Sequence, residues 1–244
     1  MLTELPELTR IDEWVEFGPH DEAAYRAAVF AGNFMAMRRA AYMPADPGKS
    51  AKLARLVELV AECASNDRKV VIFSYFRSVL DVVAGALRNT AFGPLTGSTT
   101  PAQRQALVDR FSSAAGHAVL LSQIQAGGVG LNMQTASVVI LCEPQIKPTL
   151  EEQAIARLHR MGQVRAVQAH RLLASNSSDE RLLDLLATKI RLFDDYARRS
   201  DIADASPDAV DISDVELARK IVEIEQERMA MDTAARLGEE SPPT

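Results

Sequence analysis

The sequence predicts an α/β protein built on a mostly parallel sheet with helices on its flanks. Short apolar runs rich in β-branched residues alternate, along the middle of the chain, with longer amphipathic stretches. Several of these stretches begin with residues that cap helices. Strands that alternate with helices of this length imply right-handed crossovers, and right-handed crossovers imply a mostly parallel sheet.

The elements are expected in the following order. One or two helices over Asp21–Tyr42 form a helical lead-in (residues 1–48), which Pro44–Gly48 interrupts. The predicted strands are Lys69–Ser74, Phe92–Leu95, Ala118–Leu121, Ser137–Cys142 and Val167–Leu173. The predicted helices between them are Ala51–Ala64, Val79–Arg88, Pro101–Phe111 and Leu150–Met161.

Capping residues mark three helix starts. Thr100–Gln103 offers a threonine cap, a proline at the first helical position and a glutamine at the third. Thr149–Glu152 is predicted to be a second capping box, and Gly162 is predicted to close that helix. Ser213–Glu216 opens a third helix, which is predicted to end at Gly238.

The chain is therefore divided into four parts. Residues 49–175 form the α/β lobe, and a bracing helix follows over residues 176–199. Residues 200–244 hold an acidic linker over Ser200–Asp211, the C-terminal helix and a disordered tail.

Charge is distributed unevenly. The net charge of the 244 residues is −6, but residues 1–48 carry −4, residues 49–199 carry +6 and residues 200–244 carry −8. A basic middle between acidic ends is compatible with contact to phosphate groups.

Composition points to the cytoplasm. No apolar run approaches the ~18 residues that a membrane-spanning helix needs, and the first residues lack the pattern of a signal peptide. The two cysteines, Cys63 and Cys142, are expected to be buried and reduced, and the four scattered histidines offer no metal-binding cluster.

Two patterns resemble nucleotide-binding motifs without meeting their requirements. Gly48-Lys49-Ser50 resembles the end of a P-loop, but the loop's first glycine is replaced by Met43 and no strand precedes it, so Ser50 is interpreted as a helix cap. The carboxylate pair Asp21-Glu22 follows no apolar strand and is interpreted as the solvated first turn of a helix. The sequence therefore lacks the residues that hold the phosphates and Mg²⁺.

A glycine cluster, Ala126–Asn132, follows the strand at Ala118–Leu121. Glycines there allow a ligand to approach the backbone and turn amide groups toward an anion. A tight turn between strands is the alternative interpretation. Dinucleotide binding is disfavoured because Met133 stands where a third glycine is required.

Two arginines follow Pro148. If the helix continues to Met161, then Gln153, Arg157 and Arg160 fall within an arc of roughly 60°. Ala154, Leu158 and Met161 would then form the face that packs on the sheet. Guanidinium groups at this spacing could together meet the distributed charge of a triphosphate.

These residues resemble a known motif. The stretch Gln153–Gln163 is similar to motif VI of the Swi/Snf family of superfamily-two helicase-like ATPases, Q-A-x-x-R-x-x-R-x-G-Q. Further motifs occur in the family's order over roughly residues 49–199. They are Lys69–Ser74 (motif IV), Gly97-Ser98-Thr99 with Arg104 and Phe111, Ala126–Asn132 (motif V), and Arg171-Leu172 with Glu180.

The resemblance implies a RecA-like, doubly wound lobe that pairs with a first lobe and closes on ATP and double-stranded DNA. It implies that Arg160 is the arginine finger, that Arg157 assists it, and that Gln153, Gly128 and Gly130 help bind ATP. It implies nucleic-acid contacts at Ser74, Gly97, Ser98, Thr99, Gln123, Gln125 and Gly127. The first lobe would hold Mg²⁺, so this chain alone is expected to be inactive.

The chain departs from the family pattern at several positions. Gln123-Ile124-Gln125 replaces Ser-Thr-Lys, Glu143 replaces an aspartate, and Ile146-Lys147-Pro148 replaces Trp-Asn-Pro. The departures are interpreted as marks of a bacterial branch.

The leading hypothesis is a fragment, or a separately encoded half, of a nucleoid-associated DNA translocase or remodeller. RNA polymerase or another DNA-bound protein is a further expected partner. A catalytically silent RecA-like scaffold is the alternative function, and a Rossmann-type oxidoreductase is a distant third.

Overall fold

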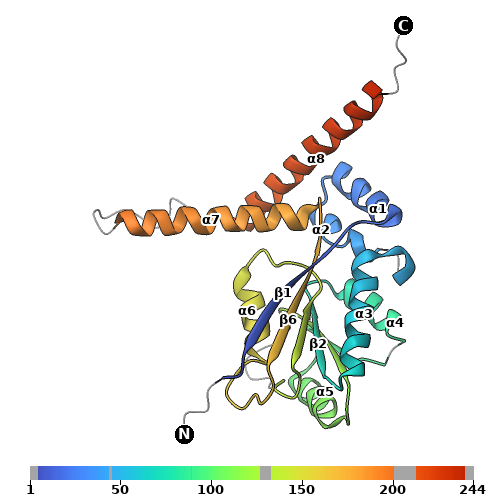
Figure 1. The fold of residues 1–244 in the computed structure, drawn as a ribbon, viewed down its shortest axis with the longest axis vertical. Coiled ribbons are helices and arrows are strands. Elements are labelled where there is room, and N and C mark those ends of the chain that lie inside the picture. The colour runs from blue at the N-terminus through green and yellow to red at the C-terminus, as the bar shows by residue number, and fades with distance from the viewer. Residues whose placement is uncertain (1–4, 44–45, 89, 127–132, 201–212, 240–244) are drawn as a thin grey trace.

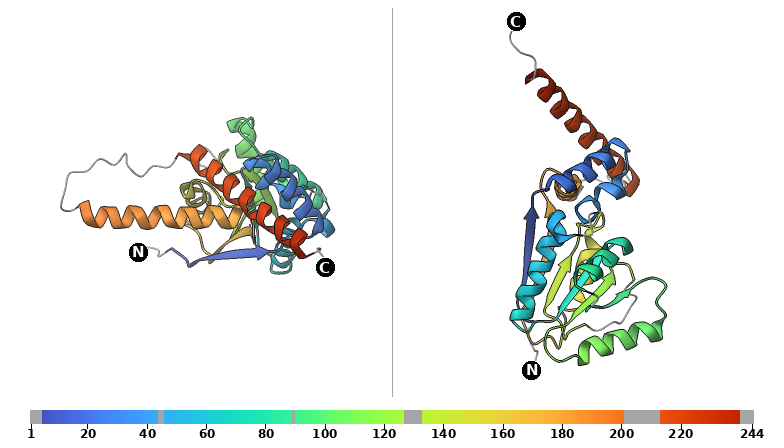
Figure 2. Two further views of the ribbon diagram at one scale, coloured as in Figure 1. Left: turned by 90° about the horizontal axis from the view of Figure 1, so that it is seen from above. Right: turned by 90° about the vertical axis from the view of Figure 1, so that its right-hand side faces the viewer.

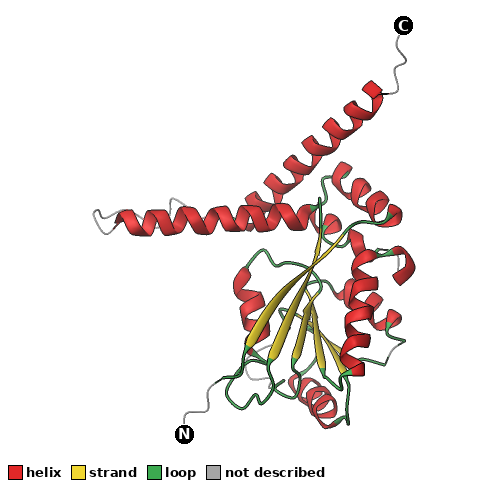
Figure 3. Ribbon diagram, viewed as in Figure 1, coloured by secondary structure: helices red, strands yellow, loops and turns green. Residues whose placement is uncertain are grey.

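The computed structural model describes residues 5–43, 46–88, 90–126, 133–200 and 213–239, and its centre is a six-stranded sheet (Figures 1 and 3). All neighbouring strands are parallel, in the order β1-β6-β5-β2-β4-β3. The strands are β1 (Leu8–Val15), β2 (Val70–Ser74), β3 (Phe92–Leu95), β4 (Val119–Gln123), β5 (Val138–Leu141) and β6 (Val167–Ala174). The predicted parallel α/β class is confirmed.

Helices cover both faces of this sheet and one end of it. They are α1 (Pro19–Phe30), α2 (Phe34–Met37), α3 (Ala51–Ser65), α4 (Arg77–Ala86), α5 (Pro101–Ser113), α6 (Pro148–Ala156), α7 (Ser178–Ser200) and α8 (Asp214–Glu239), with 3-10 turns η1 (Ala40–Tyr42) and η2 (Pro47–Lys49). Helices α3 and α4 lie on one face, and α5 and α6 lie on the other.

Alternating strand residues build a separate core on each face. On β2, Val70 and Ile72 pack among side chains of α3 and α4, whereas Val71 and Phe73 pack among those of α5 and α6. All four side chains are buried because the strand lies inside the sheet, which explains its continuous apolar run.

A third core lies beyond the carboxyl ends of the strands, where α1, α2, α7 and α8 meet. Its buried members include Tyr25, Val29, Leu182 and Ile221. From this junction α7 and α8 extend away from the sheet in different directions (Figures 1 and 2). The N- and C-terminal extensions therefore pack on each other as well as on the lobe.

The lead-in contains a strand that was not predicted. Residues Leu8–Val15 form β1, a parallel edge strand paired with β6 along its whole length, so the segment is not helical throughout. The strand has no apolar run from which it could be predicted, and ion pairs help to attach it to the lobe. Arg10 pairs with Glu152 of α6, and Asp12 pairs with Arg171 of β6.

The helix that carries motif VI is shorter than predicted. Helix α6 begins at Pro148, with Lys147 as its cap, and ends at Ala156. The predicted capping box does not form, because the cap is Lys147 rather than Thr149 and the Glu152 carboxylate binds Arg10 of β1 instead. The prediction that Gly162 closes the helix is also wrong.

Asp21 and Ser50 have different roles from those predicted. Asp21 is in the first turn of α1 but is fully buried, so the prediction of a solvated carboxylate is wrong. Its Oδ2 accepts the N–H of Ala51 at 2.8 Å and thereby caps α3. Ser50 occupies the cap position, but its hydroxyl donates to the carbonyl of Ala41.

Three further predictions concern the two cysteines, the residues after Ser200 and membrane-spanning helices. Cys63 and Cys142 are buried free thiols, as predicted. The linker after Ser200 and the last five residues are not described. Among the described helices, none has the length and apolar character needed to cross a bilayer.

Candidate functional site

Several predicted site residues lie at the carboxyl ends of adjacent parallel strands. Ser74 ends β2, the loop Gly97–Thr99 follows β3, and Gln123 ends β4, with Gln125 two residues later. Side chains that follow neighbouring parallel strands meet at one edge of the sheet, where open α/β folds bind their ligands. The fold therefore gathers residues from three separate sequence motifs.

Ser74 does not lie on the surface of this edge. Its side chain is fully buried; the hydroxyl donates to Glu143 Oε2 at 2.9 Å and accepts the N–H of Phe76 at 3.0 Å. The expectation that Ser74 contacts nucleic acid directly does not fit this burial. The serine instead shapes the turn between β2 and α4.

The loop at Gly97–Thr99 presents polar groups to solvent. Gly97 and Ser98 are exposed and Thr99 is half-buried. Thr96 binds both hydroxyls, at 2.8 Å to Ser98 and through its N–H at 3.0 Å to Thr99. Arg104, in the first turn of α5, donates to the carbonyl of Thr99 at 3.1 Å. The loop is therefore a held turn with an exposed polar tip.

Arg157 lies immediately past the end of α6 and is half-buried. Its guanidinium is 5.7 Å from the ring centre of Phe73, which lies on β2. Burial lowers the pKa of Arg157, and the charge of Arg104 lowers it further. Two guanidinium groups from different motifs thus lie close enough to repel each other.

The loop after Arg157 is held by Gln163. The buried Gln163 amide donates to the carbonyls of Ala136 at 2.9 Å and Leu158 at 3.2 Å, and its oxygen accepts the N–H of Arg165 at 2.9 Å. Gly162 has a φ of 98°, and a Cβ there would lie 3.2 Å from Gln134 Oε1. These contacts join the loop over residues 157–163 (the arginine loop) to Gln134 and Ala136, which follow the glycine cluster.

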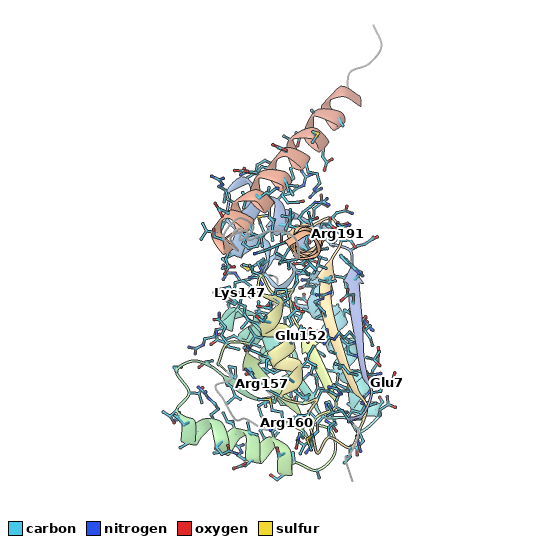
Figure 4. The ribbon with its side chains drawn as sticks, turned by 90° about the vertical axis from the view of Figure 1, so that its left-hand side faces the viewer. Glu7, Lys147, Glu152, Arg157, Arg160 and Arg191 are labelled. Carbon is cyan, nitrogen blue, oxygen red and sulfur yellow. The ribbon has the colours of Figure 1, made fainter. Side chains whose placement is uncertain are left out.

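Arg160 and Gln153 are both exposed. Neither side chain hydrogen-bonds or forms an ion pair within the described part of the chain. Figure 4 shows Arg157 and Arg160 one after the other beyond the end of α6, beside α5. The predicted helical arc is wrong beyond Ala156, and Met161 is 69% exposed rather than packed on the sheet.

Some predicted residues lie outside the described part. Gly127, Gly128 and Gly130 belong to the undescribed stretch 127–132, and so nothing is said of their structure. Gln125 is described and exposed, and it lines a cavity of about 580 Å³ together with Arg38, Tyr75 and Lys147.

Three residues belong to the site although no role was predicted for them. Arg104 and Gln163 are part of the recognised motifs, and that membership was the available signal. Glu143 is fully buried behind the edge of the sheet. No sequence signal could have shown its contacts, because they depend on how β5 pairs with β2.

Comparison with known proteins identifies a helicase domain and helicase relatives. Residues 51–162 match the family model of the helicase conserved C-terminal domain. An ATP-dependent helicase of Mycoplasma pneumoniae is 33% identical over 145 residues, which cover 59% of this chain and 14% of the relative. The ATP-dependent helicase fft1 of Schizosaccharomyces pombe is 37% identical over 145 residues, covering 59% and 15%.

A plant relative and two solved structures extend the comparison. The DNA repair protein RAD5A of Arabidopsis thaliana is 33% identical over 146 residues, covering 59% of this chain and 14% of that protein. The C-terminal part of the Fun30 ATPase domain has a TM-score of 0.75 at 18% identity, covering 93% of this chain and 99% of that one. The Sulfolobus solfataricus SWI2/SNF2 ATPase core in complex with dsDNA has a TM-score of 0.65 at 22% identity, covering 80% and 47%.

The aligned part spans about one seventh of the length of these curated relatives. The sheet and its flanking helices match the RecA-like C-terminal lobe of the Snf2 ATPases. Residues 51–162 thus form a helicase conserved C-terminal domain, and the homologues of this chain are Snf2-family ATP-dependent helicases.

Proposed function

We propose that this chain is the second lobe of an ATP-dependent translocase or remodeller of double-stranded DNA. It would supply an arginine finger and contacts to the DNA backbone, while a P-loop lobe outside these 244 residues would hold ATP and Mg²⁺. The sequence offers no Walker A pattern, which supports this division of roles.

The observation that carries the proposal is the position of Arg157, whose half-buried guanidinium is 5.7 Å from the ring centre of Phe73 on β2. Arg157 and Arg104 are close enough for the charge of one to lower the pKa of the other. The buried Nε of Arg104 has no hydrogen-bond partner among the described residues. An anion bound nearby would relieve the repulsion, and a triphosphate's terminal group has suitable charge and acceptors.

The chemistry follows from where charge develops. Phosphoryl transfer needs positioning and charge stabilisation, and an arginine finger contributes about 10³–10⁵ in rate. Arg160 is exposed and would reach across to the γ-phosphoryl group held on the first lobe. Arg157, held against Phe73, would assist it from a fixed position. Closure of the two lobes would then be coupled to hydrolysis.

The polar loop at the sheet edge would contact DNA. Exposed backbone and hydroxyl groups at Gly97 and Ser98 can bind phosphate oxygens without reading bases. One structure with this fold, the SWI2/SNF2 ATPase core, was solved in complex with dsDNA. The likeness supports the proposed duplex partner.

The decisive experiment replaces arginines in the complete two-lobe enzyme. Arg160→Ala is expected to lower kcat about 10³-fold or more while the KM for ATP changes little, because the finger's charge acts mainly in the transition state. Arg160→Lys should fail largely as well, since an ammonium group lacks the planar fork. DNA-stimulated ATP hydrolysis is the measurement.

Arg165→Ala provides the matched control. Arg165 is an exposed arginine beyond Gln163, and its guanidinium donates to the carbonyl of Asp67. Its loss should leave turnover nearly unchanged. Full turnover in a folded Arg160→Ala enzyme would transfer the finger role to Arg157, and full turnover in both Arg160→Ala and Arg157→Ala would reject the proposed function.

A further inference from the structure

A buried carboxylate links two strands behind the proposed DNA edge. Glu143, two residues after the end of β5, is fully buried and reaches the turn that follows β2. Its Oε1 accepts the N–H of Tyr75 at 2.7 Å, and its Oε2 accepts the Ser74 hydroxyl at 2.9 Å. Gln145 donates to the same carboxylate at 3.0 Å. Glu143 therefore holds the backbone of the turn as well as a side chain.

The same turn is held from its other side by a glutamine. Gln123 ends β4, and its Nε2 donates to the carbonyl of Tyr75 at 3.3 Å. Its Oε1 accepts the N–H of Gly97 at 3.4 Å. Both ends of the amide are thus engaged inside the protein, and the two partners belong to loops that follow different strands.

Together these contacts form one row across the sheet edge. The strands β5, β2, β4 and β3 are neighbours in that order. Glu143 joins the first two, and Gln123 joins the second, third and fourth through Tyr75 and Gly97. A glutamine can serve this purpose because its side chain carries both a donor and an acceptor.

We propose that Glu143 and Gln123 are positioning residues that fix the Ser74–Phe76 turn and the Gly97–Thr99 loop relative to each other. Gln123 then acts through the loop rather than by touching phosphate, which replaces its predicted role as a direct contact. The consequence for DNA affinity rests on the proposed function. The internal geometry does not depend on it.

The first test needs no DNA. Amide hydrogen exchange of the complete 244-residue chain is measured for the wild type and for Gln123→Ala. Loss of one hydrogen bond should speed exchange of the Gly97 amide about 2- to 10-fold. The matched control is Gln105→Ala on α5, where the amide donates to Asp109 at 2.8 Å and touches neither loop. Unchanged exchange at Gly97 in Gln123→Ala would overturn the proposal.

Glu143 variants test the other half of the row. Glu143→Gln keeps an acceptor for the Tyr75 N–H and should preserve its protection, whereas Glu143→Ala removes the acceptor and should expose the Tyr75 amide to faster exchange. If Glu143→Ala does not fold, Glu143→Met takes its place: it keeps the side-chain length but offers only a weak acceptor, so the Tyr75 amide should again exchange faster than in Glu143→Gln. Equal protection of the Tyr75 and Gly97 amides in all folded variants would reject the positioning role.

Duplex binding then separates this proposal from the proposed function. Gln123→Ala should weaken DNA affinity about 2- to 10-fold while Gln105→Ala does not. Faster exchange at Gly97 with no duplex binding by any protein would support the positioning role and reject the DNA function of this edge. Weaker binding with unchanged exchange would instead make Gln123 a direct contact.

Discussion

At the scale of single residues, the arginine loop owes its geometry to an amide and a glycine. The Gln163 amide donates to the carbonyl of Leu158 within the loop and to that of Ala136 outside it. Gly162 adopts a positive φ that a side chain would strain. The motif resemblance identified both residues. The predicted placement of Arg157 and Arg160 on one face of a helix was wrong, because α6 ends at Ala156. A motif records which residues recur, whereas the route of the backbone between them depends on tertiary hydrogen bonds.

Another single residue, Glu13, ties the edge strand to the lobe. Its Oε1 accepts from His170 of β6 at 2.8 Å, and its Oε2 accepts from Arg55 of α3 at 3.0 Å. Burial raises the pKa of Glu13, but the hydrogen bonds from His170 and Arg55 outweigh burial, and the pKa lies below its ordinary value of 4.5. A lowered pKa means that the ionised form stabilises the fold.

Because folding lowers the pKa of Glu13, the free energy of unfolding depends on pH. The stability from Glu13 is fully present above pH 4.5 and is lost as the pH falls through the lowered pKa of the folded protein. Glu13→Gln should reduce the free energy of unfolding by about 1–3 kcal/mol at pH 7 and flatten the loss of stability below pH 4.5. Urea unfolding at several pH values is the measurement. Glu7→Gln, an exposed carboxylate just before β1, is the control. An unchanged pH profile in Glu13→Gln would contradict the assignment.

At the scale of elements, strands and helices were predicted well where their own residues carry the apolar run or the capping box that stabilises them. The runs that form β2, β4, β5 and β6 were placed within two residues of their observed ends, because interior parallel strands are apolar on both faces. The capping box at Thr100 forms as predicted. β1 was missed because its partners, Glu152, His170 and Arg171, are distant in sequence.

The C-terminal helix is attached by a similar distant contact. Glu225 of α8 is fully buried and accepts from Tyr25 of α1 at 3.0 Å, Arg181 of α7 at 3.1 Å and Arg228 at 2.7 Å. Burial and the charge of Glu225 raise the pKa of Tyr25, which therefore remains a donor. One carboxylate thus joins three helices.

Glu225→Ala should release α8 while the sheet stays folded. Removal of Glu225 leaves the buried Tyr25 hydroxyl without its acceptor, while Arg181 and Arg228 keep acidic partners nearer the surface, so the cost is about 1–3 kcal/mol. The expected result is faster amide exchange along α8 with little change in the amides of β2 and β5. Glu223→Ala is the control, because Glu223 forms an exposed pair with Arg219 at 3.5 Å. Equal protection of α8 in both variants would show that apolar packing alone holds the helix.

At the scale of the whole molecule, charge and fold favour weak binding to DNA by this chain alone. The proposed DNA edge belongs to the region with net charge +6, but the segments before and after it carry −4 and −8. The Gly97–Thr99 loop carries no basic side chain, so counterion release on DNA binding has to come from the lysines and arginines around it. A second lobe would add both the nucleotide site and further phosphate contacts, which is why the isolated chain is also expected to hydrolyse no ATP.

Salt and a single added charge together test this picture. The isolated chain should bind duplex DNA without sequence preference, and its affinity should fall steeply as salt concentration rises. Ser98→Glu places a negative charge at the exposed tip of the loop and should weaken binding several-fold at low salt, with a smaller effect at high salt because screening reduces the repulsion. Ser65→Glu makes the same change in charge at the end of α3, by the amino ends of the strands, and should have less than about a twofold effect.

Fluorescence anisotropy of a labelled duplex at two salt concentrations gives both comparisons. Equal losses in the two variants would mean that only net charge matters, and tight binding that ignores salt would require a recognition surface other than this edge.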